Sequence, residues 1–212
     1  MTPRAALERG LLELGLELPA GASDRFLQYL ELLAKWNKTY NLTAIRDPFE
    51  MVSHHLLDSL AVAPHLPMPR DQPALADAGA GAGLPGVALA IARPAWRIVL
   101  AESNQKKAAF LRQAAIELPL PNVEVHEGRV EAWRPAAGFA VVISRAFSEL
   151  AAFIAACGHL LLPGGVLAAM KGVFPRAELE RLPVGFECVD VIALKVPWLD
   201  AARHLVLCRV KR

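Results

Sequence analysis

Two kinds of hydrophobic pattern follow one another along the chain. In residues 1–63 apolar side chains recur at helical spacing, and Phe26, Leu30 and Leu33 form such a stripe behind Ser23, a suitable N-cap. We therefore expect this region to be helical throughout, with one helix capped by Ser23.

A second helical start is visible at Asp47. Asp47 is a suitable N-cap, Pro48 takes the first helical position, and Glu50 stands three residues after the cap. This arrangement is typical of a capping box. It predicts a helix that starts at Pro48.

From about residue 70 the pattern changes to short β-type runs that alternate with helical segments. We expect strands at 74–77, 97–102, 123–128, 139–147 and 164–172, and helices at 86–93, 104–117 and 148–161. The second of these helices has Ser103 or Asn104 as its cap. Strand and helix in alternation indicate a parallel sheet with right-handed crossovers.

The last two strands break this alternation. The runs 186–196 and 203–210 are separated by too few residues for a helical crossover, so they should pair antiparallel. The predicted fold is α/β, with a mostly parallel seven-stranded sheet, an antiparallel C-terminal edge and an N-terminal helical extension. A proline-rich stretch favours a boundary between a helical region (1–66) and a sheet domain (67–212), which together form one compact unit.

Composition narrows the function without fixing it. The 212 residues carry a formal net charge of only +2, so any nucleic-acid surface must come from a local cluster of basic side chains. Cys157, Cys188 and Cys208 are far apart and form no C-x-x-C pair, which argues against disulfides or a thiolate metal site. Secretory and membrane-spanning patterns are also missing from the sequence. We expect a cytoplasmic monomer without a metal.

The densest chemical signal is the stretch from Asp77 to Gly86, DAGAGAGLPG, which follows the first predicted strand. Ligands bind beyond the carboxyl ends of strands in such sheets, and glycines let a loop fold closely around them. Residues 81–86 match the G-x-G-x-x-G of dinucleotide binding. However, an acid at Asp77 would repel a pyrophosphate, whereas it would favour the cationic S-adenosylmethionine. The pattern of 77–83 therefore favours a methyl donor over NAD.

Two further acids fit a nucleoside ligand in the same place. Glu102 ends the second strand and could accept hydrogen bonds from both ribose hydroxyls, a feature that NAD and S-adenosylmethionine sites share. Glu131 follows the third strand, where an adenine edge is expected. Glu102 therefore does not discriminate between the two ligands.

Seven segments, spread over nearly the whole chain, carry a resemblance to a known family. They are KWNKTYNLTAIRDPFEMVSHHLLDSL (35–60), DAGAGAGLPG (77–86), KKAAFLRQ (106–113), GRVEAW (128–133), VVISRAF (141–147), MKG (170–172) and RHLVLCR (203–209). In these segments the chain resembles the RsmG (GidB) family of 16S ribosomal RNA guanine-N7 methyltransferases. The N-terminal block and ISRAF are specific to that family, whereas the glycine loop alone indicates only some methyltransferase.

The resemblance implies a Rossmann-like class I methyltransferase that depends on S-adenosyl-L-methionine. Its implied reaction is methyl transfer to N7 of guanine 527, in the 530 loop of the 16S rRNA of the 30S subunit, with S-adenosyl-L-homocysteine as product. By motif, the donor would be bound by Gly79, Leu84, Val130, Glu131 and Arg145. The complete expected donor set is Asp77, Gly79, Ala80, Gly81, Gly83, Leu84, Glu102, Ser103, Val130, Glu131 and Arg145.

Guanine N7 is a chemically undemanding target. Its lone pair is free and it loses no proton, so neither a general base nor a nucleophilic cysteine is required, and positioning can supply the catalysis. SRAF (144–147) stands where enzymes that methylate exocyclic amines have a [DN]-P-P-[FYW] tetrapeptide. We expect Arg145 to contact the donor carboxylate, a phosphate or O6 alone, since a bidentate grip on guanine would occupy N7. Ala80, where the family commonly has Ser or Thr, removes a hydroxyl contact to the donor.

RNA contacts are expected mainly from the N-terminal region, where aromatic and amide side chains could stack on or hydrogen-bond to splayed bases. The expected RNA-contacting set is Lys35, Trp36, Asn37, Tyr40, Asn41 and Lys171. Lys171, after the fifth strand, would face an RNA phosphate. His54 and His55 are adjacent on a helix, so they point in different directions and do not share a metal.

Three alternatives stay open. A methyltransferase of this kind could act on another RNA or on a small molecule. An NAD-linked oxidoreductase would need Asp77 beside a pyrophosphate and a hydride-transfer partner, neither of which the sequence supports. The third alternative is a catalytically silent RNA-binding module with a vestigial donor site.

Overall fold

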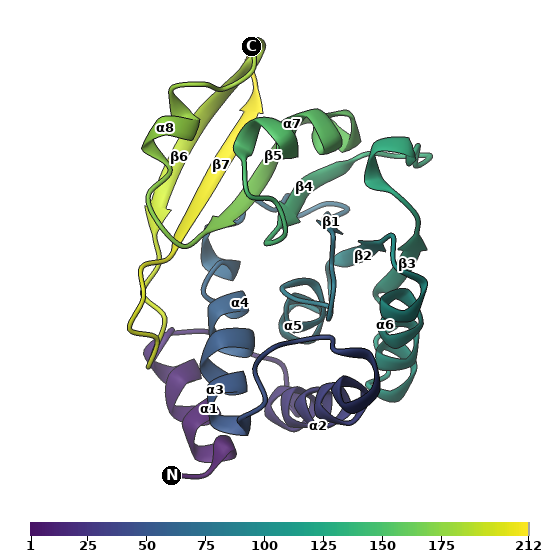
Figure 1. The fold of residues 1–212 in the computed structure, drawn as a ribbon, viewed down its shortest axis with the longest axis vertical. Coiled ribbons are helices and arrows are strands. Elements are labelled where there is room, and N and C mark those ends of the chain that lie inside the picture. The colour runs from purple at the N-terminus through teal and green to yellow at the C-terminus, as the bar shows by residue number, and fades with distance from the viewer. Residues whose placement is uncertain (212) are drawn as a thin grey trace.

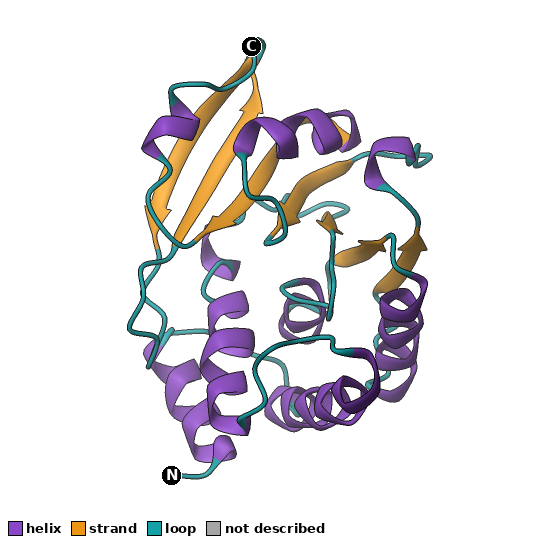
Figure 2. Ribbon diagram, in the orientation of Figure 1, coloured by secondary structure: helices purple, strands orange, loops and turns teal. Residues whose placement is uncertain are grey.

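Seven strands form one mixed sheet in the computed structural model, which describes residues 1–211 (Figures 1 and 2). The strands are β1 (Ala74–Ala78), β2 (Arg97–Glu102), β3 (Val123–Glu127), β4 (Phe139–Ser144), β5 (Leu161–Lys171), β6 (Phe186–Ala193) and β7 (His204–Val210). They lie in the order β3-β2-β1-β4-β5-β7-β6. The first five pair in parallel, and β7 pairs antiparallel with both β5 and β6. The predicted fold class and antiparallel edge are confirmed.

Three strand ends differ from the apolar pattern, and the first is that of β6, which ends at Ala193 and not at residue 196. β4 ends at Ser144, not at residue 147, because the Ser144 hydroxyl donates to the carbonyl of Ala78 (2.6 Å) and accepts from the amide of Ala146 (3.0 Å). β5 starts at Leu161, where a helix was expected to end. A continuous apolar run does not by itself distinguish a helix end from a buried strand.

Four helices follow strands of the sheet. They are α5 (Gly86–Ala92), α6 (Gln105–Glu117), α7 (Leu150–Cys157) and α8 (Arg176–Leu179). Of the two expected caps of α6, Asn104 is the one used, because its side chain accepts from the amides of Lys106 (3.0 Å) and Lys107 (3.2 Å). This cap fixes the start of α6 beside the end of β2.

The N-terminal helices are interrupted, contrary to expectation. They are α1 (Pro3–Glu13), α2 (Ala22–Tyr40), α3 (Pro48–Met51) and α4 (Asp58–Leu60), the last two joined by the π-helical turn η1 (Val52–Leu57). Gly15 and Asn41 adopt left-handed backbone that ends a helix (φ 63° and 49°). The cap of α2 is Gly21 and not Ser23, which lies in the first turn. The predicted start at Pro48 is confirmed, with Asp47 as its cap.

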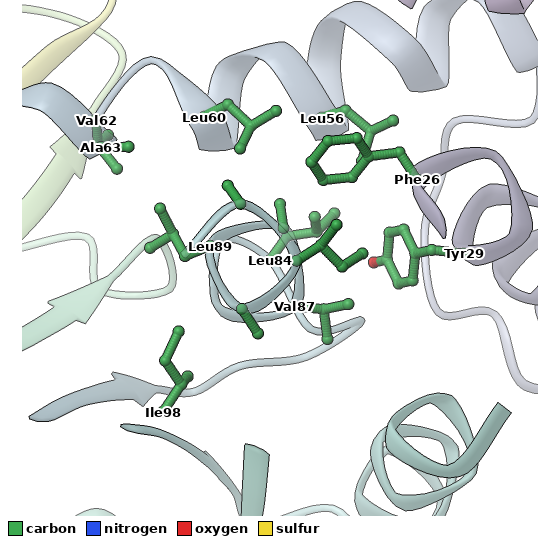
Figure 3. Packing of buried hydrophobic residues seen from close by; sticks show 14 of the residues in the cluster. Phe26, Tyr29, Leu56, Leu60, Val62, Ala63, Leu84, Val87, Leu89 and Ile98 are labelled. Atoms are coloured by element: carbon green, nitrogen blue, oxygen red, sulfur yellow. The ribbon is translucent and has the colours of Figure 1, made fainter. Parts of the chain in front are cut away.

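The N-terminal helices share a hydrophobic core with one face of the sheet and its helices α5 and α6. Phe26 and Tyr29 of α2 and Leu56 of η1 pack around Leu84 and Val87, where the loop after β1 enters α5 (Figure 3). A second cluster, to which α7 contributes, covers the opposite face of the sheet. Within residues 1–211, none of the helices combines the length and apolarity needed to cross a lipid bilayer.

Tyr29 also makes a polar link between α2 and the loop after β1. Its hydroxyl donates a 2.7 Å hydrogen bond to the carbonyl of Ala82, and the side chain is fully buried. Burial raises the pKa of Tyr29, so the phenol keeps its proton and remains a donor. The N-terminal helices therefore help to fix the loop after β1.

This link predicts a loss of stability in Tyr29→Phe. The free energy of unfolding should fall by about 1–3 kcal/mol, because the buried carbonyl of Ala82 would lose the hydrogen bond from the Tyr29 hydroxyl. Urea unfolding followed by circular dichroism measures it. Tyr40→Phe is the matched control, since Tyr40 is exposed and its hydroxyl bonds to no residue in 1–211. Equal effects of the two substitutions would contradict this role of Tyr29.

Candidate functional site

The loop after β1 turns sharply at three glycines. Gly79, Gly81 and Gly83 have positive φ values of 73°, 58° and 92°, a conformation that other residues adopt only at a cost. A Cβ at Gly79 would also lie 3.0 Å from the Cβ of Ala146 on the neighbouring loop after β4. The glycines therefore let two loops approach each other closely at the carboxyl end of the sheet. This place is the end of β1 beside β4, where the strand order reverses and where open α/β sheets bind ligands.

The end of β2 holds this glycine loop in place. The amides of Gly79 and Ala80 both donate to the carbonyl of Ala101 (2.9 and 3.0 Å). One oxygen of the Glu102 carboxylate accepts from the Gly81 amide (2.9 Å), and the other accepts from the Asn104 amide (2.8 Å). Glu102 is therefore a bridge between the glycine loop and the start of α6.

Asp77 supports the glycine loop from below. It is fully buried, and its Oδ2 accepts a 2.8 Å hydrogen bond from the Gly86 amide. Its other oxygen, Oδ1, has no partner among residues 1–211. Burial raises the pKa of Asp77 to about 7, against the opposing influence of the Gly86 amide and Arg145.

The same hydrogen bonds leave a dinucleotide little to bind. A pyrophosphate would need amides at the start of α5, but Pro85 has no N–H and the Gly86 amide is taken by Asp77. The next amide, that of Val87, donates to the carbonyl of Gly83 (2.6 Å). Asp77 thus disfavours a dinucleotide by occupying an amide, and not by facing the ligand as the sequence suggested. The match of 81–86 to G-x-G-x-x-G is coincidental in this loop.

Three adjoining pockets lie along this edge of the sheet. The β3-side pocket is lined by Gly79, Ser103, Val130, Glu131, Ala146 and Phe147, among others. The loop pocket is lined by Thr43, Gly79, Gly81, Leu84, Lys107 and Arg145, among others. The arginine pocket is lined by His55, Asp58, Arg145, Met170, Gly172 and Arg203, among others. The first two share Gly79, and the last two share Arg145, so the three lie next to one another.

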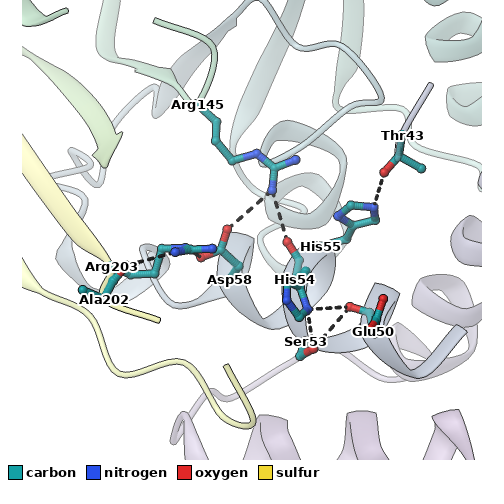
Figure 4. A network of polar contacts seen from close by, with 9 residues as sticks. All are labelled: Thr43, Glu50, Ser53, His54, His55, Asp58, Arg145, Ala202 and Arg203. Carbon is teal, nitrogen blue, oxygen red and sulfur yellow. Dashed lines mark hydrogen bonds and ion pairs between the residues drawn. The ribbon is translucent and has the colours of Figure 1, made fainter. Parts of the chain in front are cut away.

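The arginine pocket contains a network of charged side chains from distant parts of the chain (Figure 4). The carboxylate of Asp58 accepts from Nε of Arg203 (2.9 Å) and contacts Nη1 of Arg145 (3.5 Å). Nη1 of Arg145 also donates to the backbone carbonyl of His54 (3.3 Å). The Asp58 side chain is only 3% exposed, so one buried carboxylate joins α4, the loop after β4 and the start of β7.

His55 lies between the loop pocket and the arginine pocket. Its Nε2 is 2.9 Å from the hydroxyl of Thr43, whose amide donates to the side chain of Asn37 (2.9 Å). Burial, with a smaller contribution from Arg145, lowers the pKa of His55 to about 4. The imidazole is therefore neutral at pH 7 and adds no positive charge to either pocket.

Comparison with known proteins places this arrangement in a family. A model of rRNA small subunit methyltransferase G matches residues 22–206. A protein of that name from Nitrosospira multiformis is 51% identical over 216 residues, covering 99% of this chain and 98% of the relative. Another from Aromatoleum aromaticum is 53% identical over 207 residues, with coverages of 96% and 97%. The chain belongs to the rRNA small subunit methyltransferase G family.

Solved structures of other methyltransferases share the fold. The O-methyltransferase TomG from Streptomyces achromogenes, in complex with S-adenosylmethionine, matches with a TM-score of 0.59 and 17% identity, covering 100% of both chains. TrmN from Thermus thermophilus matches with a TM-score of 0.55 and 18% identity over 75% of this chain and 53% of the other. The resemblance seen in the sequence motifs is thus confirmed for both family and fold.

In this member of the rRNA small subunit methyltransferase G family, most of the expected donor residues line the first two pockets. Those in the β3-side pocket are Gly79, Ser103, Val130 and Glu131, and those in the loop pocket are Gly79, Ala80, Gly81, Leu84 and Arg145. Asp77, Gly83 and Glu102 lie behind the loop and line neither pocket. These three hold the shape of the loop: Asp77 and Glu102 bond its amides, and Gly83 supplies a positive φ.

The expected RNA-contacting residues are more scattered. Asn37 is buried and accepts from the Thr43 amide, so its side chain is structural. Trp36 is partly buried against Phe110, with ring centroids 5.6 Å apart. Lys35 lines a separate pocket between α2 and α6. Tyr40 and Asn41, at the end of α2, are exposed, and the ring of Tyr40 packs against Trp36 with centroids 5.3 Å apart.

The surroundings of Lys171 also differ from the expectation that its side chain would face an RNA phosphate. It is 9% exposed, and its amino group donates to the carbonyl of Ser148 and to Glu178 Oε2 (2.8 Å). The same Glu178 oxygen accepts from the Leu150 amide (2.7 Å), at the start of α7. Lys171 is thus committed to the loop between β4 and α7 and is not a free contact for phosphate. A lysine after an apolar strand gives no sign of such a partner, because Glu178 comes from a different element.

Sequence reasoning missed Asp58, Arg203 and Lys107 as pocket residues. Asp58 and Arg203 both lie inside segments that carry the family resemblance, which was the available signal. Their pairing over 145 positions could not be inferred without the fold. Lys107 is on the first turn of α6, and its place in the loop pocket follows from the Asn104 cap.

The raised pKa of Asp77 predicts a stability that depends on pH. Its carboxyl has a pKa of about 7 in the folded protein and about 3.8 when unperturbed. Its stabilising contribution is therefore full below pH 3.8 and is lost as pH rises through 7. Asp77→Asn keeps an acceptor for Gly86 and cannot ionise. Urea unfolding at pH 5 to 8 should show the variant gaining on wild type by a few kcal/mol as pH rises, and a constant difference would contradict the assignment.

The buried tie of Lys171 predicts a stability loss that a surface lysine would not show. Lys171→Met removes the charge partner of Glu178 and should lower the free energy of unfolding by more than about 2 kcal/mol. Lys35→Met, at an exposed position on α2, is the control and should change it by less than about 0.5 kcal/mol. Thermal and urea unfolding measure both. An equally small effect of Lys171→Met would show that Lys171 behaves as a surface lysine and not as part of a buried ion pair.

Proposed function

We propose that this protein transfers the methyl group of S-adenosyl-L-methionine to N7 of guanine 527 in the 16S rRNA of the small ribosomal subunit. The proposal rests on its family and on one structural observation. The pocket lined by the glycine loop shares Arg145 with a second pocket, whose wall carries excess positive charge. A donor and an RNA nucleotide could therefore meet at Arg145.

The residues present fit the donor. The three positive-φ glycines open the loop without a pyrophosphate-binding helix start, which suits a ligand without phosphates. Glu131, on the wall of the β3-side pocket, is available for an adenine edge or a ribose. Its pKa is lowered, first by a backbone amide and then by Arg129, so the group is an anion at neutral pH. When bound, S-adenosyl-L-methionine supplies an electrophilic methyl group on a cationic sulfur and leaves as S-adenosyl-L-homocysteine.

The chain has to position the reactants more than to transform them. N7 attacks through its free lone pair and no proton leaves, so a general base is not needed. No cysteine lines any of the three pockets in residues 1–211, and burial raises the pKa of Cys157 and Cys208 to about 12. His55 is neutral and already bonded to Thr43. Alignment within fixed walls can contribute up to about 7–11 kcal/mol, which is the role left to the protein.

The finer parts of the proposal concern the substrate form and its setting. We take the 30S subunit or a late assembly intermediate as the substrate, the cytoplasm as the compartment, and a monomer without metal as the active form. The expected donor residues that line the first two pockets and the exposed Tyr40 and Asn41 remain the proposed contacts, together with Lys107, which lines the loop pocket.

Methyl transfer tests the proposed function directly. Labelled S-adenosylmethionine is supplied with 30S subunits, naked 16S rRNA or mature 70S ribosomes, and the modified base is mapped. Wild type should label guanine 527. Gly79→Val should lose at least about 100-fold in rate, because a side chain at φ +73° meets Ala146 and displaces the loop. Gly15→Ala, at a positive φ of 63° with open space around it, is the control and should remain active.

Several outcomes would contradict this function. Label on a base other than guanine, or on a small molecule in place of RNA, would overturn the acceptor. Calorimetric binding of NADH without binding of S-adenosylmethionine would overturn the donor. Full activity of Gly79→Val would remove the glycine loop from the site.

A further inference from the structure

The arginine pocket holds two guanidinium groups against one carboxylate. Asp58 is the acid that contacts Arg145 and Arg203, at 3.5 and 2.9 Å. The remaining cation on the wall, Lys171, is already paired with Glu178. The three cations face two carboxylates, so the wall carries one net positive charge that these acids do not balance.

Several N–H groups of these arginines are also free to bind a ligand. Arg203 uses Nε for Asp58 and Nη1 for the carbonyl of Ala202 (2.9 Å), which leaves Nη2. Arg145 uses only Nη1, for Asp58 and the carbonyl of His54, which leaves Nε and Nη2 without a partner in residues 1–211 (Figure 4). A planar guanidinium with free N–H groups matches the oxygens of a phosphate.

The position of the pocket favours RNA over the donor as its occupant. Arg145 lines both the loop pocket and the arginine pocket, whereas Arg203 lines only the arginine pocket. The glycine loop lies in the first of these and not in the second. A group bound between the two arginines would thus sit on the other side of Arg145 from the glycine loop, a position that suits the strand carrying the acceptor base better than the donor.

We propose that the arginine pocket binds a phosphodiester group of the RNA strand that carries the acceptor guanine, and that Asp58 is a positioning residue for both arginines. The inference rests on the proposed function and adds a subsite to it. Asp58 is buried and fixed on α4, so it holds two like charges close together that would otherwise repel each other. One added phosphate then neutralises the remaining charge.

The decisive variant is the pair Asp58→Asn with Arg203→Gln. It removes one acid and one base, so the net charge is that of wild type and no buried carboxylate is left unpaired. Arg9→Gln with Glu13→Gln is the matched control, because it removes an exposed ion pair (3.2 Å) on α1 with the same change in charge. Thermal unfolding checks that both proteins fold.

The readout is binding to a 16S rRNA fragment that contains the 530 loop, measured over 50–300 mM salt. The variant pair should bind about tenfold more weakly at fixed salt, as expected for loss of a charge-assisted contact. The slope of log affinity against log salt should fall by about 0.7 for the lost phosphate contact. Calorimetric binding of S-adenosylmethionine should weaken less than RNA binding does, because Arg203 lines only the arginine pocket while Asp58 also contacts Arg145. The control pair should match wild type in all three measurements.

Two results would overturn the subsite. RNA affinity and salt slope equal to wild type would show that no phosphate is bound there. A selective loss of S-adenosylmethionine affinity would assign the pocket to the donor carboxylate. If the pair does not fold, Arg203→Lys takes its place, because lysine keeps the positive charge but lacks the planar guanidinium with its several N–H donors. RNA should then bind more weakly while the affinity for S-adenosylmethionine stays unchanged. Unchanged RNA binding would overturn the subsite.

Failure of this inference is distinct from failure of the proposed function. If wild type labels guanine 527 while the variant pair binds RNA as wild type does, only the subsite is wrong. If wild type labels another acceptor, the proposed function is wrong whatever the variants do.

Discussion

The candidate ligand site depends on the two hydrogen bonds that the carboxylate of Glu102 accepts. Its two oxygens accept the amides of Gly81 and Asn104, so one side chain at the end of β2 fixes both the glycine loop and the start of α6. Charge-assisted bonds of this kind are about twice as strong as neutral ones, and Glu102 is 7% exposed, which shields them from water. Without them, the positive-φ part of the loop at Gly81 would lose its side-chain link to β2.

The loop is also secured by contacts from below and from the side. Asp77 occupies the first amide of α5, and Tyr29 of α2 donates to the carbonyl of Ala82. These bonds satisfy backbone groups that a buried loop could not leave unpaired. They have a chemical consequence as well, because amides that are used internally are not available to a pyrophosphate. The same hydrogen bonds that give the loop its shape thus also limit which cofactors it can accept.

On the side of the arginine pocket, ion pairs between charged side chains hold the loops in place. Lys171 and Glu178 hold the loop between β4 and α7, and Asp58 holds Arg145 at its start. The N-terminal helices therefore contribute to the site, since Asp58 of α4 contacts Arg145 in the loop after β4. For a reaction in which N7 loses no proton, such fixed walls are the main contribution that a protein can make.

Much of the fold follows from the sequence because short apolar runs and their caps act locally. The alternation of strands and helices, the antiparallel end and the starts at Pro48 and Asn104 depend on residues a few positions apart. Local signals were less reliable at ends, where Gly21 and Ser144 act through backbone geometry or a distant carbonyl.

The sequence by itself determined the family, the order of the elements and the place of the glycine loop, since these depend on motifs that are continuous in the chain. Only the tertiary structure decided what the charged side chains do. Asp77 accepts a hydrogen bond from the Gly86 amide at the end of the glycine loop, and Lys171 pairs with Glu178 of α8. Asp58 pairs with Arg203 across 145 positions. The physical reason is that the partner of a buried charge is chosen by proximity in space, and proximity between distant segments exists only once the sheet has formed.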